Sequence, residues 1–424
     1  MTADGEVTAA CPIPGAHRRL LEAHTLWHAA EEAYTDPELF RINLNALIQA
    51  TRNVTFVLQN EHEGVPDFEA WYATWRERMG AEPVLRWSVL ARNRVVKQGD
   101  LDTRSTARVS VIASYGGPTL VADITVPPMH STEQIARELD ASMPSREADT
   151  PLNKAMRENG LVRVERRWID TDLPDAELLD ALAHCYAVLA DLVNDAHRLT
   201  GSDEATTDAR PACMQATEEA RTAYVHLGTH EVFHPRMSTA TIDTSASEAR
   251  YGENPQYAKG AGAAAGSGDV FAFAEAAVER AKTVLVKDGY HAPALFLFGP
   301  DGRVTPYALQ FHDRQDKYVQ WERVAREVER LGATGLVFIS EAWIAMVDAK
   351  TPVVSPSEDP KRGEILVVTA AMADGRQRSY GVRFKRRLFG RFRFEPTVVL
   401  EDQRDFFLDA VRRVWKPQAP ALKK

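Results

Sequence analysis

Three residues near the middle of the chain have the types and spacing of a zinc site. His230, Glu231 and His234 spell the HExxH pattern, in which two histidines on one helix face hold zinc and the glutamate acts as a base. Residues 224–233 nevertheless favour a β-hairpin with a Gly-Thr turn, and Pro235 follows directly. In a strand the two histidines would lie roughly 13 Å apart, too far to share an ion.

A basic stretch near the C-terminus is a second candidate. Residues 375–394 hold eight basic residues and no acidic one, with five aromatic residues among them. An extended strand would place Arg383, Lys385 and Arg387 on one face, which suits phosphate contact and base stacking in RNA. The alternative is a solvated edge strand whose lysine and arginine residues prevent pairing with other chains and whose aromatic residues lie in the core. The nucleic-acid-binding side chains that we predict are Arg383, Lys385, Arg386, Arg387, Arg391 and Arg393.

A third candidate closes a predicted helix at residues 92–97. Arg92 and Asn93 lie one turn before Lys97. Metal-independent RNA cleavage needs a proton acceptor and a cation that stabilises the charged phosphorane. The stretch resembles the signature of the HEPN superfamily, the helical-bundle domains of many prokaryotic RNA-cutting toxins and defence proteins. In that signature an arginine and a polar residue precede a histidine.

The resemblance covers residues 17–100 and implies a composite catalytic site of Arg92, Asn93 and Lys97 in a homodimer. Lys97 stands where the family has histidine, and an amine is a poor general base at neutral pH. The resemblance therefore implies RNA binding or an altered metal-independent ribonuclease in bacterial defence or a toxin–antitoxin system. The final domain also resembles, loosely, uncharacterised bacterial domains with a Ser-Glu-Asp-Pro stretch, which imply no known activity.

Composition excludes several classes of protein. The chain has 424 residues, 44% hydrophobic and 26% charged, which is typical of a globular protein of two to three domains. Its net charge of −9 argues against a wholly basic nucleic-acid coat. The three cysteines form no CxxC pair, so they predict no zinc ribbon and no disulfide framework. Neither a phosphate-binding loop nor a GxSxG elbow occurs. We expect no cofactor and no metal ligands.

The termini and the apolar segments predict a cytoplasmic protein. The first residues lack the basic start and the long apolar core of a signal peptide. No stretch approaches the ~18 uninterrupted apolar residues of a spanning helix. We therefore expect no contact with a membrane.

The elements that must position these residues begin with a helical bundle. Apolar residues at three- and four-residue spacing predict four helices between residues 17 and 99. Asp36 is the expected N-cap of the second helix and Pro37 its first residue. Residues 107–113 and 119–126 predict a β-hairpin, and residues 133–139 and 175–199 predict further helices.

The remaining segments predict an α+β fold. Helices are expected at residues 270–287, 317–331 and 404–414. Strands are expected at 294–298, 304–310, 335–339, 364–371 and 378–384, without a regular βαβ rhythm. Polar residues 201–210 and the Gly/Ala-rich residues 259–268 have the composition of linkers. We divide the chain into a bundle with a hairpin (1–130), a helical and mixed region (131–258) and an α+β domain (269–424).

Three functions follow from these patterns. The first is RNA binding or degenerate ribonuclease activity. The second is a non-enzymatic adaptor that dimerises through its bundle and binds a partner through its last domain. The third is a zinc-dependent hydrolase that uses His230, Glu231 and His234.

Overall fold

A computed structural model describes most of the chain. The described residues are 11–112, 121–142, 151–202, 207–234, 269–345, 356, 359–387, 391–401 and 405–415. The linker expected at residues 259–268 lies outside them.

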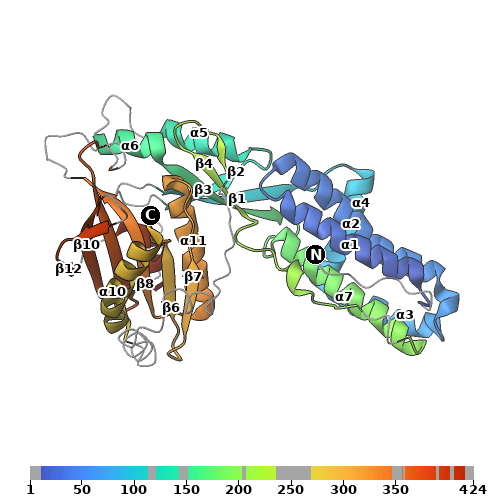
Figure 1. Cartoon of the computed structure of the whole chain (residues 1–424). Coiled ribbons are helices and arrows are strands. Elements are labelled where there is room, and N and C mark those ends of the chain that lie inside the picture. Colours follow the sequence, from blue (N-terminus) through green and yellow to red (C-terminus); the bar gives the residue numbers. More distant parts are fainter. Residues whose placement is uncertain are drawn as a thin grey trace. The chain divides into compact units, whose positions relative to one another are not determined.

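The chain divides into two compact units, and the first consists of residues 1–112, 119–144 and 161–233. Its helices pack side by side into a bundle (Figure 1) around Trp27, Leu44 and Leu182, all less than 3% exposed. The bundle helices are α1 (Pro14–Glu32), α2 (Pro37–Asn60), α3 (Phe68–Ala81), α4 (Pro83–Lys97) and α7 (Leu178–Leu199).

Helix starts in the bundle follow the local sequence. The Asp36 carboxylate accepts hydrogen bonds from the backbone N–H groups of Glu38 and Leu39, and Pro37 is the first residue of α2, as predicted. Pro14 and Pro83 begin α1 and α4. Proline is tolerated there because the first N–H groups of a helix have no partner within it.

An antiparallel five-stranded sheet completes the first unit, in the order β2-β1-β3-β4-β5. The strands are β1 (Thr103–Ile112), β2 (Val121–Val126), β3 (Leu161–Asp170), β4 (Thr222–His226) and β5 (Val232–Phe233), with helix α5 (Thr132–Ser142) and 3-10 turns η1 (His62–Gly64) and η4 (Ala212–Met214). The predicted hairpins β1–β2 and β4–β5 are confirmed. The central strand β3 was not predicted.

The second unit consists of residues 113–118, 145–160 and 234–424. Its antiparallel sheet has the order β11-β10-β9-β8-β6-β7, and β12 pairs with β10. The strands are β6 (Ala294–Phe298), β7 (Val304–Ala308), β8 (Gly335–Ile344), β9 (Gly363–Met372), β10 (Gln377–Arg387), β11 (Arg391–Phe394) and β12 (Val398–Glu401). The helices are α6 (Pro151–Asn159), α10 (Val270–Asp288), α11 (Arg314–Leu331) and α12 (Asp409–Trp415), with the 3-10 turn η6 (Phe406–Leu408).

Helices cover both faces of this second sheet. Helix α10 packs against one face, where Val337, Val368 and Val382 belong to its core. Helices α11 and α12 share another core with Leu336 and Phe338 on the opposite face. The predicted α+β class is confirmed, since both sheets are antiparallel and the N-terminal part is helical. In the described part of the chain, no helix is long and apolar enough to cross a bilayer.

Candidate functional site

The basic stretch forms a β-hairpin at the edge of the second sheet. In the β10–β11 register, Lys385 lies opposite Arg393 and Arg387 lies opposite Arg391. Directly opposed residues of antiparallel strands project from the same face. Arg383 joins them because alternate residues of a strand share a face. The hairpin therefore places on one face basic side chains that occupy a stretch of eleven residues in the sequence.

We call these five side chains the cationic face: Arg383, Lys385, Arg387, Arg391 and Arg393. All five are exposed. Within the described residues none of the five has an ion pair, although arginines elsewhere on this chain pair frequently with carboxylates. Exposed like charges at this spacing create a local positive potential despite the net charge of −9.

Arg386 lies on the opposite face of the hairpin from these five residues. Its guanidinium donates to the carboxylates of Glu341 and Glu364, each at 2.8 Å, and to the backbone carbonyl of Gly289. The structure thus separates Arg386 from the other predicted nucleic-acid contacts, because strand alternation turns it toward α10.

The aromatic residues that the structure describes in the hairpin lie away from the cationic face, and Phe389 is outside the described residues. Phe384 is 3% exposed, and Phe392 and Phe394 pack against the core under α10. They share the face of Arg386, since Phe384 is opposite Phe394 and Arg386 is opposite Phe392. The expected stacking of bases on these rings is therefore wrong, because the rings are used in the core.

An open hollow of about 460 Å³ lies at the end of the hairpin and is lined by both the hairpin and the end of α10. Arg386, Arg387 and Arg391 line it, together with Lys287 and Asp288 at the end of α10. This hollow is wide enough for a phosphate group, and four of its five charged lining residues are basic.

Arg92, Asn93 and Lys97 lie on the last turns of α4. The Arg92 guanidinium lies over the Phe56 ring, 5.5 Å from its centroid, and Lys97 is the exposed last residue of the helix. Between them, Arg94 forms a 2.6 Å ion pair with Asp172. A catalytic role for Arg92, Asn93 and Lys97 stays a prediction.

The HExxH residues do not form a helix. His230 lies in the β4–β5 turn with a positive φ of 60°, and its N–H donates to the His226 carbonyl at 2.8 Å. Its Nε2 atom lies 3.3 Å from the carboxylate of Asp140 on α5. The hairpin reading of this segment is confirmed, and the helical zinc-protease geometry of His230, Glu231 and His234 is absent.

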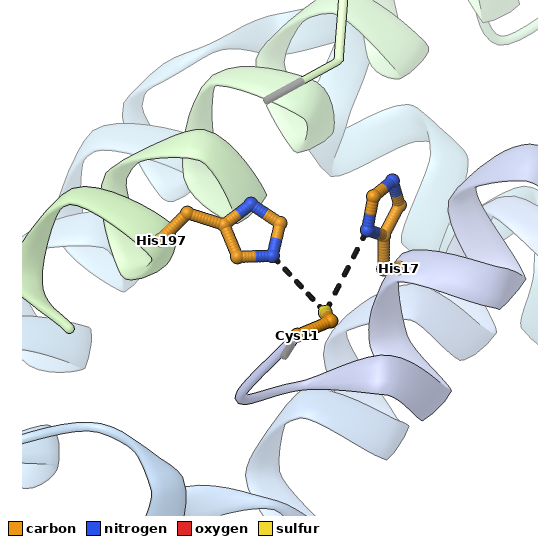
Figure 2. A group of neighbouring side chains, drawn as sticks. All are labelled: Cys11, His17 and His197. Carbon is orange, nitrogen blue, oxygen red and sulfur yellow. Dashed lines mark hydrogen bonds between the residues drawn. The ribbon is translucent and has the colours of Figure 1, made fainter. Parts of the chain in front are cut away.

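A cluster of cysteine and histidine lies inside the first unit (Figure 2). The Cys11 sulfur is 3.2 Å from Nε2 of His197 and 3.7 Å from Nδ1 of His17. Cys11 precedes α1, His17 belongs to its first turns, and His197 lies near the end of α7. Their exposed fractions are 8%, 2% and 0%.

Burial determines the protonation of this cluster. Desolvation lowers the pKa of His197 to about 4, with a further contribution from His17, and it lowers the pKa of His17 as well. Both imidazoles are therefore neutral at pH 7. Burial also raises the pKa of the Cys11 thiol. Neutral imidazole is the form that binds metals, because its ring nitrogen keeps a lone pair.

A second cluster lies further along α1. Nε2 of His24 is 3.2 Å from the Cys213 sulfur and 3.2 Å from Nε2 of His28. The other ring nitrogen of His28, Nδ1, is 3.3 Å from the Glu31 carboxylate. This cluster is more open, since Cys213 is exposed and His28 is half-buried.

Sequence reasoning missed both clusters because their members are far apart along the chain. Cys11 and His197 are separated by 186 positions, and His24 and Cys213 by 189. One signal was present: three histidines recur along α1 at spacings of seven and four residues, which places them on one helix face. The expectation of no metal ligands rested on the absence of CxxC pairs.

Comparison with known proteins identifies a family. The family model described as bacteriophage lambda protein ea47 matches residues 4–423. Protein ea47 of Escherichia phage lambda is 27% identical over 335 residues, which are 77% of this chain and 78% of that protein. No solved structure matches the chain.

These matches overturn both resemblances drawn from the sequence. The HEPN resemblance rested on Arg92, Asn93 and a few helices over residues 17–100, and amphipathic bundles with a basic last turn are common. The family match over residues 4–423 also includes the final domain, so the predicted resemblance of that domain to uncharacterised bacterial domains is wrong. The chain belongs to the bacteriophage lambda protein ea47 family.

Proposed function

We propose that the protein binds RNA through the cationic face of the β10–β11 hairpin. One observation carries this proposal: five exposed basic side chains share one face and have no ion pair within the described residues. Phosphate oxygens are suitable partners, because arginine binds phosphate through two parallel hydrogen bonds and lysine acts as a compact point charge.

The geometry favours contact with the phosphate backbone over reading of bases. The three phenylalanines that the structure describes in the hairpin pack into the core, so none of these rings is presented beside the cations. Backbone contacts carry no sequence information. Binding should therefore depend weakly on sequence and strongly on salt.

Edge protection is the alternative role for the same charges. Strand β11 ends the strand order of its sheet, and basic residues on an edge strand discourage pairing with other chains. This role needs charge on the edge strand itself. It gives no reason for Arg383, Lys385 and Arg387 on β10 to remain unpaired.

Fluorescence anisotropy with a labelled single-stranded RNA of mixed sequence tests the proposal. If all five cations contact phosphates, the plot of log affinity against log salt should have a slope of about −3.5, at about −0.7 per contact. Replacement of Arg387 and Arg391 by alanine should weaken binding and flatten the slope by about 1.4. Arg108→Ala is the matched control, because Arg108 is an exposed strand arginine that pairs with Asp123.

Three results would contradict the proposal. They are no RNA affinity at low salt, equal losses from the Arg108 control, and binding of duplex DNA without binding of RNA. Aggregation of the hairpin variants with unchanged RNA affinity would assign the charges to edge protection.

The predicted homodimer and cytoplasmic location stay predictions. The end of α4, which carries Arg92, Asn93 and Lys97, contributes only positive charge in this proposal.

A further inference from the structure

Three potential metal ligands converge in the first unit, and none of them takes part in the proposed RNA contact. We propose that Cys11, His17 and His197 bind a zinc ion. The site joins the segment before α1 to the last turn of α7, and its three ligand atoms all lie within 4.8 Å of one another. In Figure 2 the Cys11 sulfur lies between the two imidazole rings.

The distances fit a common tetrahedral ion. With zinc–sulfur bonds of about 2.3 Å and zinc–nitrogen bonds of about 2.05 Å, tetrahedral angles place sulfur and nitrogen about 3.6 Å apart. The two observed sulfur–nitrogen distances, 3.2 and 3.7 Å, lie on either side of that value. Both sulfur–nitrogen distances therefore need to change by only a few tenths of an ångström, and the two ligand nitrogens lie within 4.8 Å of each other.

Hydrogen bonds alone satisfy this cluster poorly. A thiol has one proton and is a weak donor and acceptor, yet Cys11 faces a ring nitrogen of His17 and another of His197. Burying polar groups with weak partners costs free energy. A shared metal ion would bind the sulfur and both nitrogens at once.

Thr207 holds the His17 ring in the orientation that metal binding requires. The Thr207 hydroxyl lies 2.9 Å from Nε2 of His17, the nitrogen that faces away from the sulfur. Asn194 of α7 fixes the Thr207 backbone through two hydrogen bonds of 2.7 and 2.8 Å. Metal-binding histidines commonly donate their other N–H to such a partner, which sets the tautomer. Thr207 is thus a positioning residue.

The chemical types of the three ligands indicate which metal would bind. One thiolate and two imidazoles suit zinc, whereas magnesium and calcium prefer oxygen ligands. Three protein ligands leave one tetrahedral position for a water molecule. Binding releases the thiol proton, because the thiolate is the ligand form of cysteine.

The second cluster on α1 is the competing location for an ion. His24, His28 and Cys213 have similar spacing, but this cluster is more exposed. We assign the site to Cys11 because its three ligand residues are all buried and because Thr207 orients a ligand ring. The two clusters can be separated, since the chain contains only three cysteines.

A variant in which Cys11 is the sole cysteine provides the main test. Cys185→Ala with Cys213→Ser removes the other two thiols; the Cys185 side chain lies on α7 beside the Val84 carbonyl. Purified full-length protein is titrated with cobalt(II), and the absorption spectrum is recorded. One equivalent of cobalt with a thiolate-to-cobalt charge-transfer band, displaced by one equivalent of zinc, is the expected result. Absence of that band overturns the proposal.

A second test uses the positioning residue and leaves all three ligands in place. Thr207→Val in the same background should weaken cobalt affinity by about 10- to 100-fold, and Thr207→Ser should restore it. The unsubstituted chain should contain one equivalent of zinc by elemental analysis. The Cys11→Ser variant, which retains Cys213, should contain less. Zinc that persists in Cys11→Ser and disappears in Cys213→Ser would assign the metal to the second cluster and overturn the proposal.

Discussion

The Arg386 guanidinium donates to the Glu341 carboxylate at 2.8 Å, on the face of the hairpin that α10 covers. Its neighbour Arg387 projects from the other face and has no ion pair among the described residues. Two adjacent arginines thus serve different purposes, because successive side chains of a strand alternate between faces.

Replacing each of these arginines by alanine should have different effects, one on the stability of the protein and the other on its RNA binding. Arg386→Ala removes two partly exposed ion pairs, each worth about 0.2–1 kcal/mol, and should lower the free energy of unfolding by about 1 kcal/mol. Arg387→Ala should leave stability nearly unchanged and weaken RNA binding. Urea unfolding and anisotropy on both variants check this. A larger affinity loss from Arg386→Ala would contradict the division of roles.

Glu177 should make stability depend on pH. Its buried carboxylate accepts hydrogen bonds from Tyr34 and from the first N–H groups of α7, and burial raises its pKa. Because the folded pKa exceeds the unfolded value of about 4.3, the contribution to stability is greatest below that value. It declines as the pH rises through the folded pKa.

Glu177→Gln should remove this pH dependence, because the amide keeps an acceptor for the helix start but carries no charge. Urea unfolding of both proteins from about pH 4 upward measures the difference in stability. The wild type should lose stability relative to Glu177→Gln as the pH rises. Parallel curves would mean that ionisation of Glu177 does not affect folding.

Gly335 should resist substitution because α10 lies directly over it. A Cβ atom at this position would meet Cγ2 of Val270 at 2.6 Å. Gly335→Ala should therefore cost about 1–3 kcal/mol through overpacking, and Val270→Ala in the same chain should recover part of the loss. Thermal unfolding measures both effects.

Gly80 is the matched control for that substitution. It lies in helix α3, and a Cβ atom there would meet nothing within 4 Å. Gly80→Ala should stabilise the protein by about 0.5–1 kcal/mol, since alanine loses less backbone entropy on folding. Destabilisation at both glycines would argue against the contact with Val270 as the cause.

The Asp36 cap should contribute to the stability of the bundle. Asp36→Ala leaves the N–H groups of Glu38 and Leu39 without their side-chain acceptor and should cost about 1 kcal/mol. Asp36→Asn retains an acceptor oxygen and should recover most of that loss. Chemical unfolding of the three proteins measures it, and equal losses for Ala and Asn would point to charge instead of hydrogen bonding.

Local signals in the sequence were sufficient for many elements of this fold. Asp36, Pro37 and Pro83 mark helix starts through capping and a fixed φ, both of which act over one turn. Short runs of apolar residues located strands β6 and β8, although β8 continues to Ile344, five residues beyond the prediction. Strand alternation also placed Arg383, Lys385 and Arg387 on one face before the fold was known.

Strand β3 required the tertiary structure. Four of its residues from 163 to 167 are charged, which in sequence indicates a solvated segment. The fold instead buries Arg166 to 2% exposure, with its guanidinium 2.7 Å from the Ser105 hydroxyl and 4.3 Å from the Trp168 ring centroid. Ser105 lies on β1, and the Pro128 carbonyl, which Arg166 also contacts at 3.0 Å, lies after β2, so local propensity carries no information about these partners.

The proposed zinc site likewise depends on the tertiary structure. Cys11, His17 and His197 become neighbours only because α1 packs against α7. The sequence by itself determined most helices, though not α6, most strands and the alternation that makes a cationic face. Only the packed structure decided which of those side chains meet, since contacts between distant segments depend on how whole elements pack and not on local spacing.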